Sequence, residues 1–228
     1  IKDRDKLFVQ TAASFQQRFN IDVQIMTEVI AINPIAKTIT AIKSPTGETY
    51  EEAYDKLILS PGAEPVRPPL PGVDIEGIFT LRSVRDTDLI KGYLNRKSAR
   101  RAVVVGAGFI GLEMAENFHH LGLQVSIVEM GGQVLAPVDF PIASIVQQHI
   151  RSKGVALYLN AAVASFAKSG EAITVSLNNG KQLTADIVIL SIGVRPDTRL
   201  ALQAGLKTGE ARGIWVNEYL QTSNPDIY

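Results

Sequence analysis

The stretch Ala102-Val103-Val104-Val105-Gly106-Ala107-Gly108-Phe109-Ile110-Gly111 decides the fold of this chain. Its first four residues are small or β-branched and apolar, as is typical of a strand buried on both faces. A GxGxxG arrangement of glycines follows, and residues 110–121 have the apolar spacing of a helix that ends at Gly122. We therefore expect a strand, a tight turn and a helix in immediate succession.

Each glycine of this turn has a mechanical reason. Gly106 permits the sharp change of direction, Gly108 allows a pyrophosphate to approach the backbone, and Gly111 lets the helix pack close to the strand. The free N–H groups at the start of the helix would hold phosphate oxygens. The competing interpretation is a glycine-rich turn that packs tightly and binds nothing.

An acidic residue at the end of the next strand favours the binding interpretation. Glu129 ends the predicted strand 124–129 and follows Gly106 by 23 residues, close to the spacing of roughly 20 in dinucleotide-binding units. Its carboxylate can accept hydrogen bonds from an adenosine ribose diol and would repel a 2′-phosphate. Because Met130-Gly131-Gly132 offers no Arg for such a phosphate, the sequence predicts NAD(H) in preference to NADP(H).

The elements that follow predict the fold class. A helix at 143–153, a strand at 155–159 and a core strand at 186–190 extend the strand–helix alternation, which implies a parallel sheet with right-handed crossovers. Three short strands near 162–167, 172–177 and 182–184 form a small antiparallel meander, with Asn179-Gly180 as a hairpin turn. The prediction is an α/β fold with a Rossmann-like parallel sheet.

The first hundred residues are patterned differently. Apolar residues from Leu7 to Phe19 have near-helical spacing, Ile21–Ile25 alternates like a strand, and 28–33 and 38–43 resemble paired strands. Leu57–Leu59 is predicted to be a short buried strand. Five prolines between 61 and 71 then indicate an extended connector. A helix is predicted at 83–95, with Ser83 as N-cap and Asp86 at N3.

Composition excludes several functional classes. The 228 residues are 46% hydrophobic, with 23 Lys and Arg against 23 Asp and Glu, and no cysteine. Balanced charge argues against nucleic-acid or anionic-membrane binding, and the absence of cysteine excludes thiol chemistry within this chain. The three histidines are not spaced as ligands, so no metal site is predicted. The charged N-terminus and the lack of an apolar run of about 18 residues predict a cytoplasmic protein.

A short-chain dehydrogenase would place a Tyr-x-x-x-Lys pair downstream of the glycine turn. The pair with this spacing, Tyr93 and Lys97, lies upstream on the connector helix, so that interpretation is rejected.

Four segments carry a resemblance to FAD-dependent pyridine nucleotide-disulfide oxidoreductases, most closely the branch with coenzyme A-disulfide reductases, NADH oxidases and persulfide reductases. Tyr54-Asp55-Lys56-Leu57-Ile58-Leu59-Ser60-Pro61-Gly62-Ala63 resembles the passage from the FAD domain to the NAD domain. Gly106 to Glu113 resembles the NAD turn. Asp186 to Asp197, containing Ser191-Ile192-Gly193-Val194, resembles the loop under the nicotinamide. Gln221 to Tyr228 resembles the return into the FAD domain.

The resemblance implies an internal fragment of a longer enzyme. A partial FAD-binding domain of the same fold type would occupy 1–72, a connector with a helix 73–100, a complete NAD-binding domain 101–210, and a truncated return segment 211–228. The redox cysteine, the second FAD motif and a dimerisation domain would lie outside this chain. The full-length protein would be a homodimer, and the fragment alone would be inactive.

The resemblance also implies roles for individual residues. Glu113 would orient the nicotinamide carboxamide, and Phe109 would occupy the place of an aromatic gate over the flavin. FAD would be held by Val29, Ser60 and Gly62. The residues expected to bind NAD(H) are Gly106, Gly108, Phe109, Ile110, Gly111, Glu129, Ile192, Gly193 and Val194.

The implied reaction passes hydride from NADH to flavin and then to a small-molecule disulfide, a persulfide or oxygen. Two alternatives stay open: a cysteine-independent flavoprotein reductase of the ferredoxin-reductase kind, and a non-catalytic module that senses NADH. The sequence does not choose among the electron acceptors.

Overall fold

The computed structural model describes residues 9–228, which divide into two compact units. Unit 1 contains the described part of Ile1–Gly62 together with Pro196–Tyr228, and unit 2 is Ala63–Arg195. The chain therefore leaves unit 1, completes unit 2 and returns. The division falls earlier in the sequence than our predicted boundaries at 72 and 210, and it includes the connector helix in unit 2.

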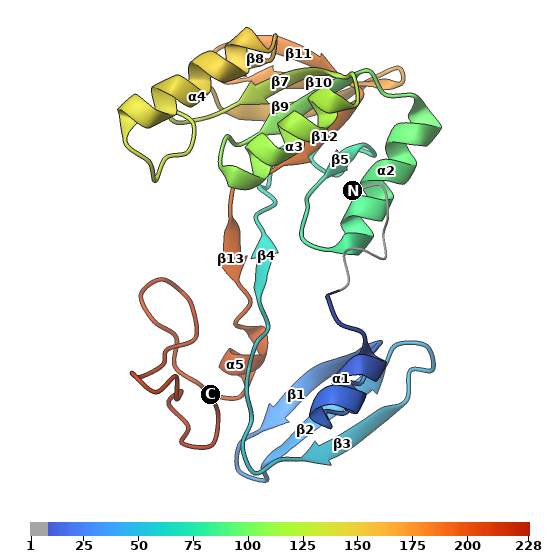
Figure 1. The fold of residues 1–228 in the computed structure, drawn as a ribbon, viewed down its shortest axis with the longest axis vertical. Helices are drawn as coiled ribbons and strands as arrows, with labels where there is room; N and C mark the ends of the chain where they lie inside the picture. The colour runs from blue at the N-terminus through green and yellow to red at the C-terminus, as the bar shows by residue number, and fades with distance from the viewer. Residues whose placement is uncertain (1–8) are drawn as a thin grey trace. The chain divides into compact units, whose positions relative to one another are not determined.

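Unit 2 is built on a five-stranded sheet in the order β5-β12-β6-β7-β8, in which every neighbouring pair is parallel. The strands are β5 (Ile78–Phe79), β6 (Arg101–Val105), β7 (Gln124–Val128), β8 (Ala156–Tyr158) and β12 (Ile187–Leu190). The helices of this unit are α2 (Val84–Lys97), α3 (Phe109–His120) and α4 (Phe140–Ser152). A separate antiparallel sheet contains β9 (Val163–Ser169), β10 (Ala172–Leu177) and β11 (Gln182–Ala185). The predicted α/β fold with an antiparallel meander is confirmed (Figure 1).

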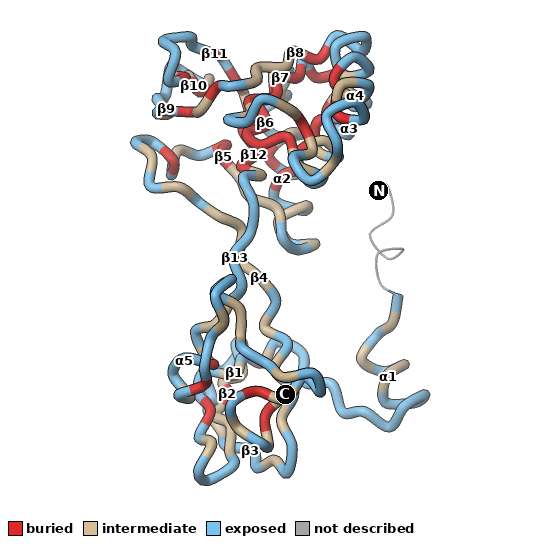
Figure 2. Tube along the Cα trace, turned by 90° about the vertical axis from the view of Figure 1, so that its left-hand side faces the viewer, coloured by how far each residue is buried: buried red, intermediate tan, exposed pale blue. Residues whose placement is uncertain are grey.

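Successive residues of β6 and β12 pack into two different cores. Val103 and Val105 join Val163, Phe166 and other residues of the antiparallel sheet. Ala102 and Val104 join a second core with residues of α2, α3 and α4. The sheet is thus covered by helices on one face and by β9–β11 on the other, which explains why β12 is apolar and buried throughout and why β6 is apolar and buried after Arg101 (Figure 2).

The strand order reverses at β6. From β6 the chain moves outward through β7 to β8, then returns to place β12 on the opposite side of β6. The carboxyl ends of β6 and β12 therefore flank a topological switch point, the place where open α/β sheets bind ligands.

The amino ends of β6 and β12 are held together by Asp186. Its carboxylate accepts hydrogen bonds from the N–H groups of Arg100 and Arg101, both at 2.9 Å, and from the Arg101 guanidinium at 2.6 Å. Burial raises the pKa of Asp186, but these hydrogen bonds outweigh it and hold the pKa below its usual value. The charged form of this carboxylate therefore stabilises the folded chain.

Unit 1 contains a three-stranded antiparallel sheet in the order β1-β2-β3. Its elements are α1 (Ala12–Phe19), β1 (Thr27–Asn33), β2 (Thr38–Lys43), β3 (Thr49–Ala53) and α5 (Arg199–Gln203). Its small core joins Ile32 to Ala201, Leu206 and Ile227. A separate two-stranded sheet pairs β4 (Ala63–Pro65) with β13 (Val194–Pro196).

Two predictions for unit 1 were wrong. Ile21–Ile25 forms no strand, because Ser44 N–H bonds to Met26 and regular pairing with β2 begins only at Thr27. Leu57–Leu59 is an isolated parallel bridge to Ile227, and Ile58 is 76% exposed.

The N-terminal helix begins later in the sequence than the apolar spacing from Leu7 predicted. It starts at Ala12 because Thr11 forms a capping box with Ser14. Leu7 and Phe8 lie outside the described residues. The predicted N-cap Ser83, with Asp86 at N3, is confirmed for α2. Within residues 9–228, no helix is long and apolar enough to cross a membrane.

Candidate functional site

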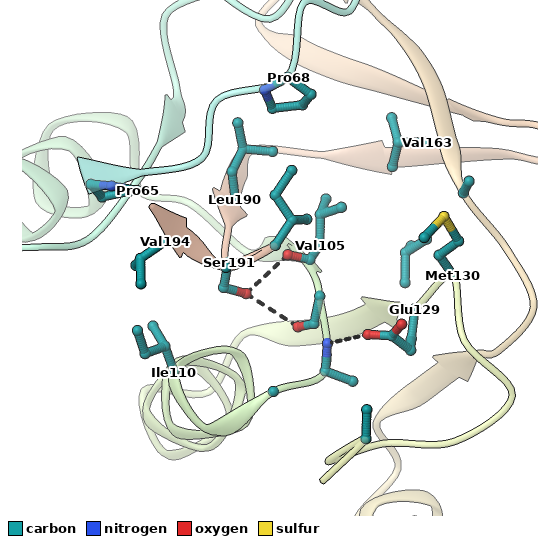
Figure 3. A pocket seen from close by; sticks show the side chains of 18 of the residues that line it. Pro65, Pro68, Val105, Ile110, Glu129, Met130, Val163, Leu190, Ser191 and Val194 are labelled. Carbon is teal, nitrogen blue, oxygen red and sulfur yellow. Dashed lines mark hydrogen bonds between the residues drawn. The ribbon is translucent and has the colours of Figure 1, made fainter. Parts of the chain in front are cut away.

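A cavity of about 630 Å³ lies at the switch point of unit 2 (Figure 3). This volume is in the range of small-molecule and cofactor sites. Its lining comes from the connector, the glycine turn, the end of β7, the start of the antiparallel sheet and the loop after β12. The lining residues include Pro65, Pro68, Leu81, Gly106, Gly108, Phe109, Ile110, Glu129, Met130, Ala136, Pro137, Ala162, Val163, Ser191, Ile192, Gly193 and Val194.

The three glycines of the turn differ in what surrounds them. Gly106 has φ +100°, and a Cβ there would lie 2.3 Å from the Ser191 carbonyl oxygen. A Cβ on Gly111 would lie 2.0 Å from the Gly106 carbonyl oxygen, so this glycine allows the helix to pack on the turn. Around Gly108, a Cβ would meet nothing within 4 Å. The protein's own packing therefore does not require a glycine at this position.

The start of α3 supplies donors to this open space. Gly108 is the N-cap, and no side chain caps the helix. The first N–H groups of an α-helix have no partner within the helix and carry its positive dipole end. The turn therefore offers an uncapped helix N-terminus beside an unobstructed glycine, which fits an approaching phosphate.

Glu129 lies next to the glycine turn, and backbone N–H groups orient both of its carboxylate oxygens. Oε2 accepts from the Ala107 N–H at 2.7 Å (Figure 3). Oε1 accepts from the Gly131 N–H at 2.7 Å. A carboxylate has about four acceptor positions, so these two bonds leave capacity for two further donors. This is the requirement for holding the two hydroxyls of a ribose.

Ser191 ties the loop after β12 to the glycine turn. Its hydroxyl lies 2.9 Å from the Val105 carbonyl oxygen and 3.1 Å from that of Gly106 (Figure 3). Its backbone N–H donates to the Val105 carbonyl oxygen at 2.8 Å. The loop that follows, residues 192–194, forms the opposite wall from Glu129. Gly193 has φ +107°, which favours glycine at that point.

The structure brings most of the predicted nucleotide-binding residues together around one cavity. Phe109 lines the cavity and is 65% exposed. Ile110 on α3 and Val194 on β13 also line it. Gly111 is buried beneath the turn, where it contacts Gly106.

Five predicted site residues do not line this cavity: Gly111, which lies beneath the turn, and Glu113, Val29, Ser60 and Gly62. Glu113 is exposed on α3 and borders a separate groove between α3 and α4. Val29, Ser60 and Gly62 belong to unit 1. Their predicted roles in orienting nicotinamide and holding FAD stay predictions.

Ser60 and Gly62 nevertheless follow a parallel pair of segments. Leu57 bridges Ile227 in parallel, and the Leu59 N–H donates to the Tyr228 carbonyl oxygen at 2.7 Å. Ser60 and Gly62 lie just beyond the carboxyl end of this pair, and Gly62 has φ +73°. Carboxyl ends of parallel strands are where α/β sheets bind cofactors.

Several lining residues were missed from the sequence. Pro65 and Pro68 were interpreted only as a connector, although the cluster of prolines marks a rigid segment. Val163 is the first residue of β9 and Ala162 precedes it. No local signal places this part of the chain over the cavity.

The three histidines border the groove between α3 and α4 and not the cavity. Across residues 9–228, no group of three or more His, Cys, Asp or Glu side chains is placed to hold a metal ion.

The fold and the site define a class: a Rossmann-like α/β domain with an open glycine turn at its switch point. Residues 2–228 match the family model described as pyridine nucleotide-disulphide oxidoreductase. The chain belongs to this family, as the sequence predicted.

Similar proteins support this assignment. An NADH oxidase from Methanocaldococcus jannaschii is 37% identical across 100% of this chain and 50% of its own length. A coenzyme A disulfide reductase from Staphylococcus haemolyticus is 32% identical, again over 100% and 50%. The chain thus spans about half the length of the curated relatives it matches.

Solved structures agree with the fold. The reduced CoADR-RHD of Bacillus anthracis has a TM-score of 0.97 and 45% identity, covering 100% of this chain and 41% of that one. An NAD-dependent persulfide reductase from A. fulgidus has a TM-score of 0.91 and 36% identity, covering 97% and 40%. Another similar structure, at 30% identity, is a water-forming NADH oxidase from Lactobacillus brevis bound to NADH, with a TM-score of 0.91 over 100% of this chain and 50% of that one.

Proposed function

We propose that unit 2 is the NADH-binding domain of an FAD-dependent oxidoreductase that reduces a disulfide or persulfide. The observation that carries the proposal is the pairing of an open glycine turn with an oriented Glu129 carboxylate at the switch point. The pyrophosphate would lie over Gly108 at the uncapped start of α3. The adenosine ribose would donate to Glu129, whose two oxygens are already oriented by Ala107 and Gly131.

The nicotinamide would lie at the other end of the cavity. The cavity lining there would include Phe109 and Ile110 on α3 and residues 192–194. The exposed Gly193 allows a flat ring to lie against backbone. We assign Glu113 to the nicotinamide carboxamide, as the family resemblance implies. Bound NADH supplies a hydride, and the role of this chain is to hold and orient it.

FAD binding is proposed from the family and from the parallel pair in unit 1. Ser60 and Gly62 beyond that pair, together with Val29 on β1, would contact FAD. The whole protein would be a homodimer, with the redox cysteine in a part of the protein outside this chain.

Charge at Glu129 provides the direct test. We expect isothermal titration of the protein to give NADH binding at least about fivefold tighter than NADPH binding, because a second unit charge within about 4 Å costs about 1 kcal/mol even in water. E129Q removes the charge and should narrow this ratio, whereas E116Q, on the exposed side of α3, should leave it unchanged. Equal binding of NADH and NADPH by the unsubstituted protein would contradict the assignment of Glu129.

Turnover by the whole protein tests the acceptor. We expect NADH-dependent reduction of persulfide or of coenzyme A disulfide to exceed oxygen consumption. A second candidate is electron transfer to a partner protein: a nitric oxide reductase FlRd-NAD(+) reductase from Klebsiella pneumoniae is 35% identical over 98% of this chain. Rapid reduction of a ferredoxin-type acceptor without disulfide reduction would favour that candidate.

A further inference from the structure

The loop between β7 and α4, residues 130–138, forms one wall of the cavity next to Glu129. Met130, Ala136 and Pro137 from this loop line the cavity. The loop contains no strand or helix of its own. Its position must therefore be set by the bonds it makes to its surroundings.

One contact of this loop is to the glycine turn. The Leu135 N–H donates to the Ala107 carbonyl oxygen at 2.9 Å, and Leu135 adopts a left-handed φ of +50° to do so. A residue other than glycine is strained in this region of backbone conformation. Because this conformation is unfavourable for leucine, other contacts must hold the loop in place.

A buried glutamine supplies such a contact. The Val134 N–H, on a residue with no exposed surface, donates to Oε1 of Gln147 at 3.1 Å. Gln147 lies on α4 and is 6% exposed, on the same buried helix face as Ala143. Among residues 9–228, Gln147 and Thr222 are the polar residues classed as buried, and Thr222 belongs to unit 1.

An apolar residue of similar size would satisfy the packing at this position. What it would not supply is an acceptor for the Val134 N–H, and an orphaned buried donor is costly. The amide of Gln147 is therefore explained by the loop it holds. Gln147 itself does not line the cavity.

We propose that Gln147 is a positioning residue for the dinucleotide. Through Val134 it holds the 130–138 loop against the glycine turn, and it thereby sets the affinity of the cavity for the adenosine half of the ligand. The proposal rests on the proposed NADH site, in which Glu129 marks the adenosine end. It predicts an effect that is selective for one half of NADH.

The test compares Q147M with Q148M. Gln148 is the next residue on α4 and is exposed, so its variant makes the same chemical change without touching the loop. The ligands are ADP-ribose, nicotinamide mononucleotide and NADH, titrated well below the melting temperature of each variant.

We expect Q147M to weaken ADP-ribose and NADH binding by at least about fivefold, the equivalent of about 1 kcal/mol for an unsatisfied buried donor. Binding of nicotinamide mononucleotide should change less than twofold. Amide hydrogen exchange at Val134 and Leu135 should accelerate, while exchange at Ile127 in β7 stays as it was. Q148M should match the unsubstituted protein throughout.

The outcomes separate the two proposals. If the unsubstituted protein binds neither NADH nor ADP-ribose, the proposed function fails. If it binds both, and Q147M binds ADP-ribose as tightly as Q148M does, the role of Gln147 fails alone. If Q147M binds ADP-ribose and nicotinamide mononucleotide more weakly by the same factor, Gln147 has a general structural role, and the proposed positioning role is also overturned. If Q147M does not fold, Q147N, whose amide is too short to reach Val134, undergoes the same measurements.

Discussion

Replacing Gly108 by alanine should separate ligand binding from stability. The added Cβ would meet no protein atom within 4 Å, and Gly108 is absent from the positive-φ glycines. Replacing glycine by alanine, where the backbone conformation allows it, stabilises the folded protein by about 0.4–1 kcal/mol because it lowers the conformational entropy of the unfolded chain. The loss of glycine at an N-cap costs a similar amount. We therefore expect G108A to change the free energy of unfolding by less than about 1 kcal/mol.

The effect on NADH should be much larger. The Cβ would occupy the space through which the pyrophosphate approaches the first N–H groups of α3. Losing one hydrogen bond to a charged group costs about 1.5–3 kcal/mol, so the dissociation constant should rise by at least about tenfold. Titration calorimetry with NADH, alongside urea denaturation, measures both quantities on the same preparation.

Gly92 provides the matched control. It is exposed on α2, is not among the positive-φ glycines, and also has open space around its Cβ position. G92A should raise the free energy of unfolding by roughly 0.5–1 kcal/mol, because glycine is unfavourable inside a helix, and should leave NADH binding unchanged. The reasoning is refuted if G108A binds NADH within twofold of the unsubstituted protein, or if it loses several kcal/mol of stability.

Two further substitutions test the packing and the charge of the sheet. G111A places a Cβ 2.0 Å from the Gly106 carbonyl oxygen, so α3 must shift and the free energy of unfolding should fall by about 1–3 kcal/mol; an unchanged urea midpoint would contradict this. Since the folded-state pKa of Asp186 lies below its usual value, its contribution is present at neutral pH and is lost as the pH falls through that lowered pKa. D186N should therefore be less stable at pH 7, and its deficit should shrink below about pH 4, near the ordinary aspartate pKa, in denaturation curves recorded from pH 7 down to pH 2.

The predictable part of the fold was encoded locally. β6, the glycine turn and α3 lie in one continuous stretch with strand and helix periodicity, so both fold class and turn followed from it. β3 was missed because Thr49–Ala53 is mostly exposed and polar, and its stability comes from pairing with β2. The strand predicted at Ile21–Ile25 had the right alternation and no partner, which shows that periodicity predicts a strand only where an edge is available to pair with it.

The site followed the same rule. The turn and Glu129 of the proposed site could be predicted because both lie at the spacing that is typical of dinucleotide-binding units. The positioning role that we propose for Gln147 could not be predicted, because it depends on a single hydrogen bond to a residue thirteen positions earlier in the chain. A glutamine on an apolar helix face is the one local hint, and only the loop shows what it accepts.

The way the chain passes between the two units has a consequence for the order of folding. Unit 1 is made from two separate stretches, so its formation must close a loop containing all of unit 2. For a flexible loop of that length, the length-dependent entropy is roughly 4 kcal/mol. Once unit 2 is folded, the Val66 N–H bonds to Gly193 and β4 lies against β13, so the loop is already closed. Folding of unit 2 thus brings together the two chain segments that form unit 1. In a pulsed hydrogen-exchange experiment during refolding, the amides of the five-stranded sheet of unit 2 should become protected before those of unit 1.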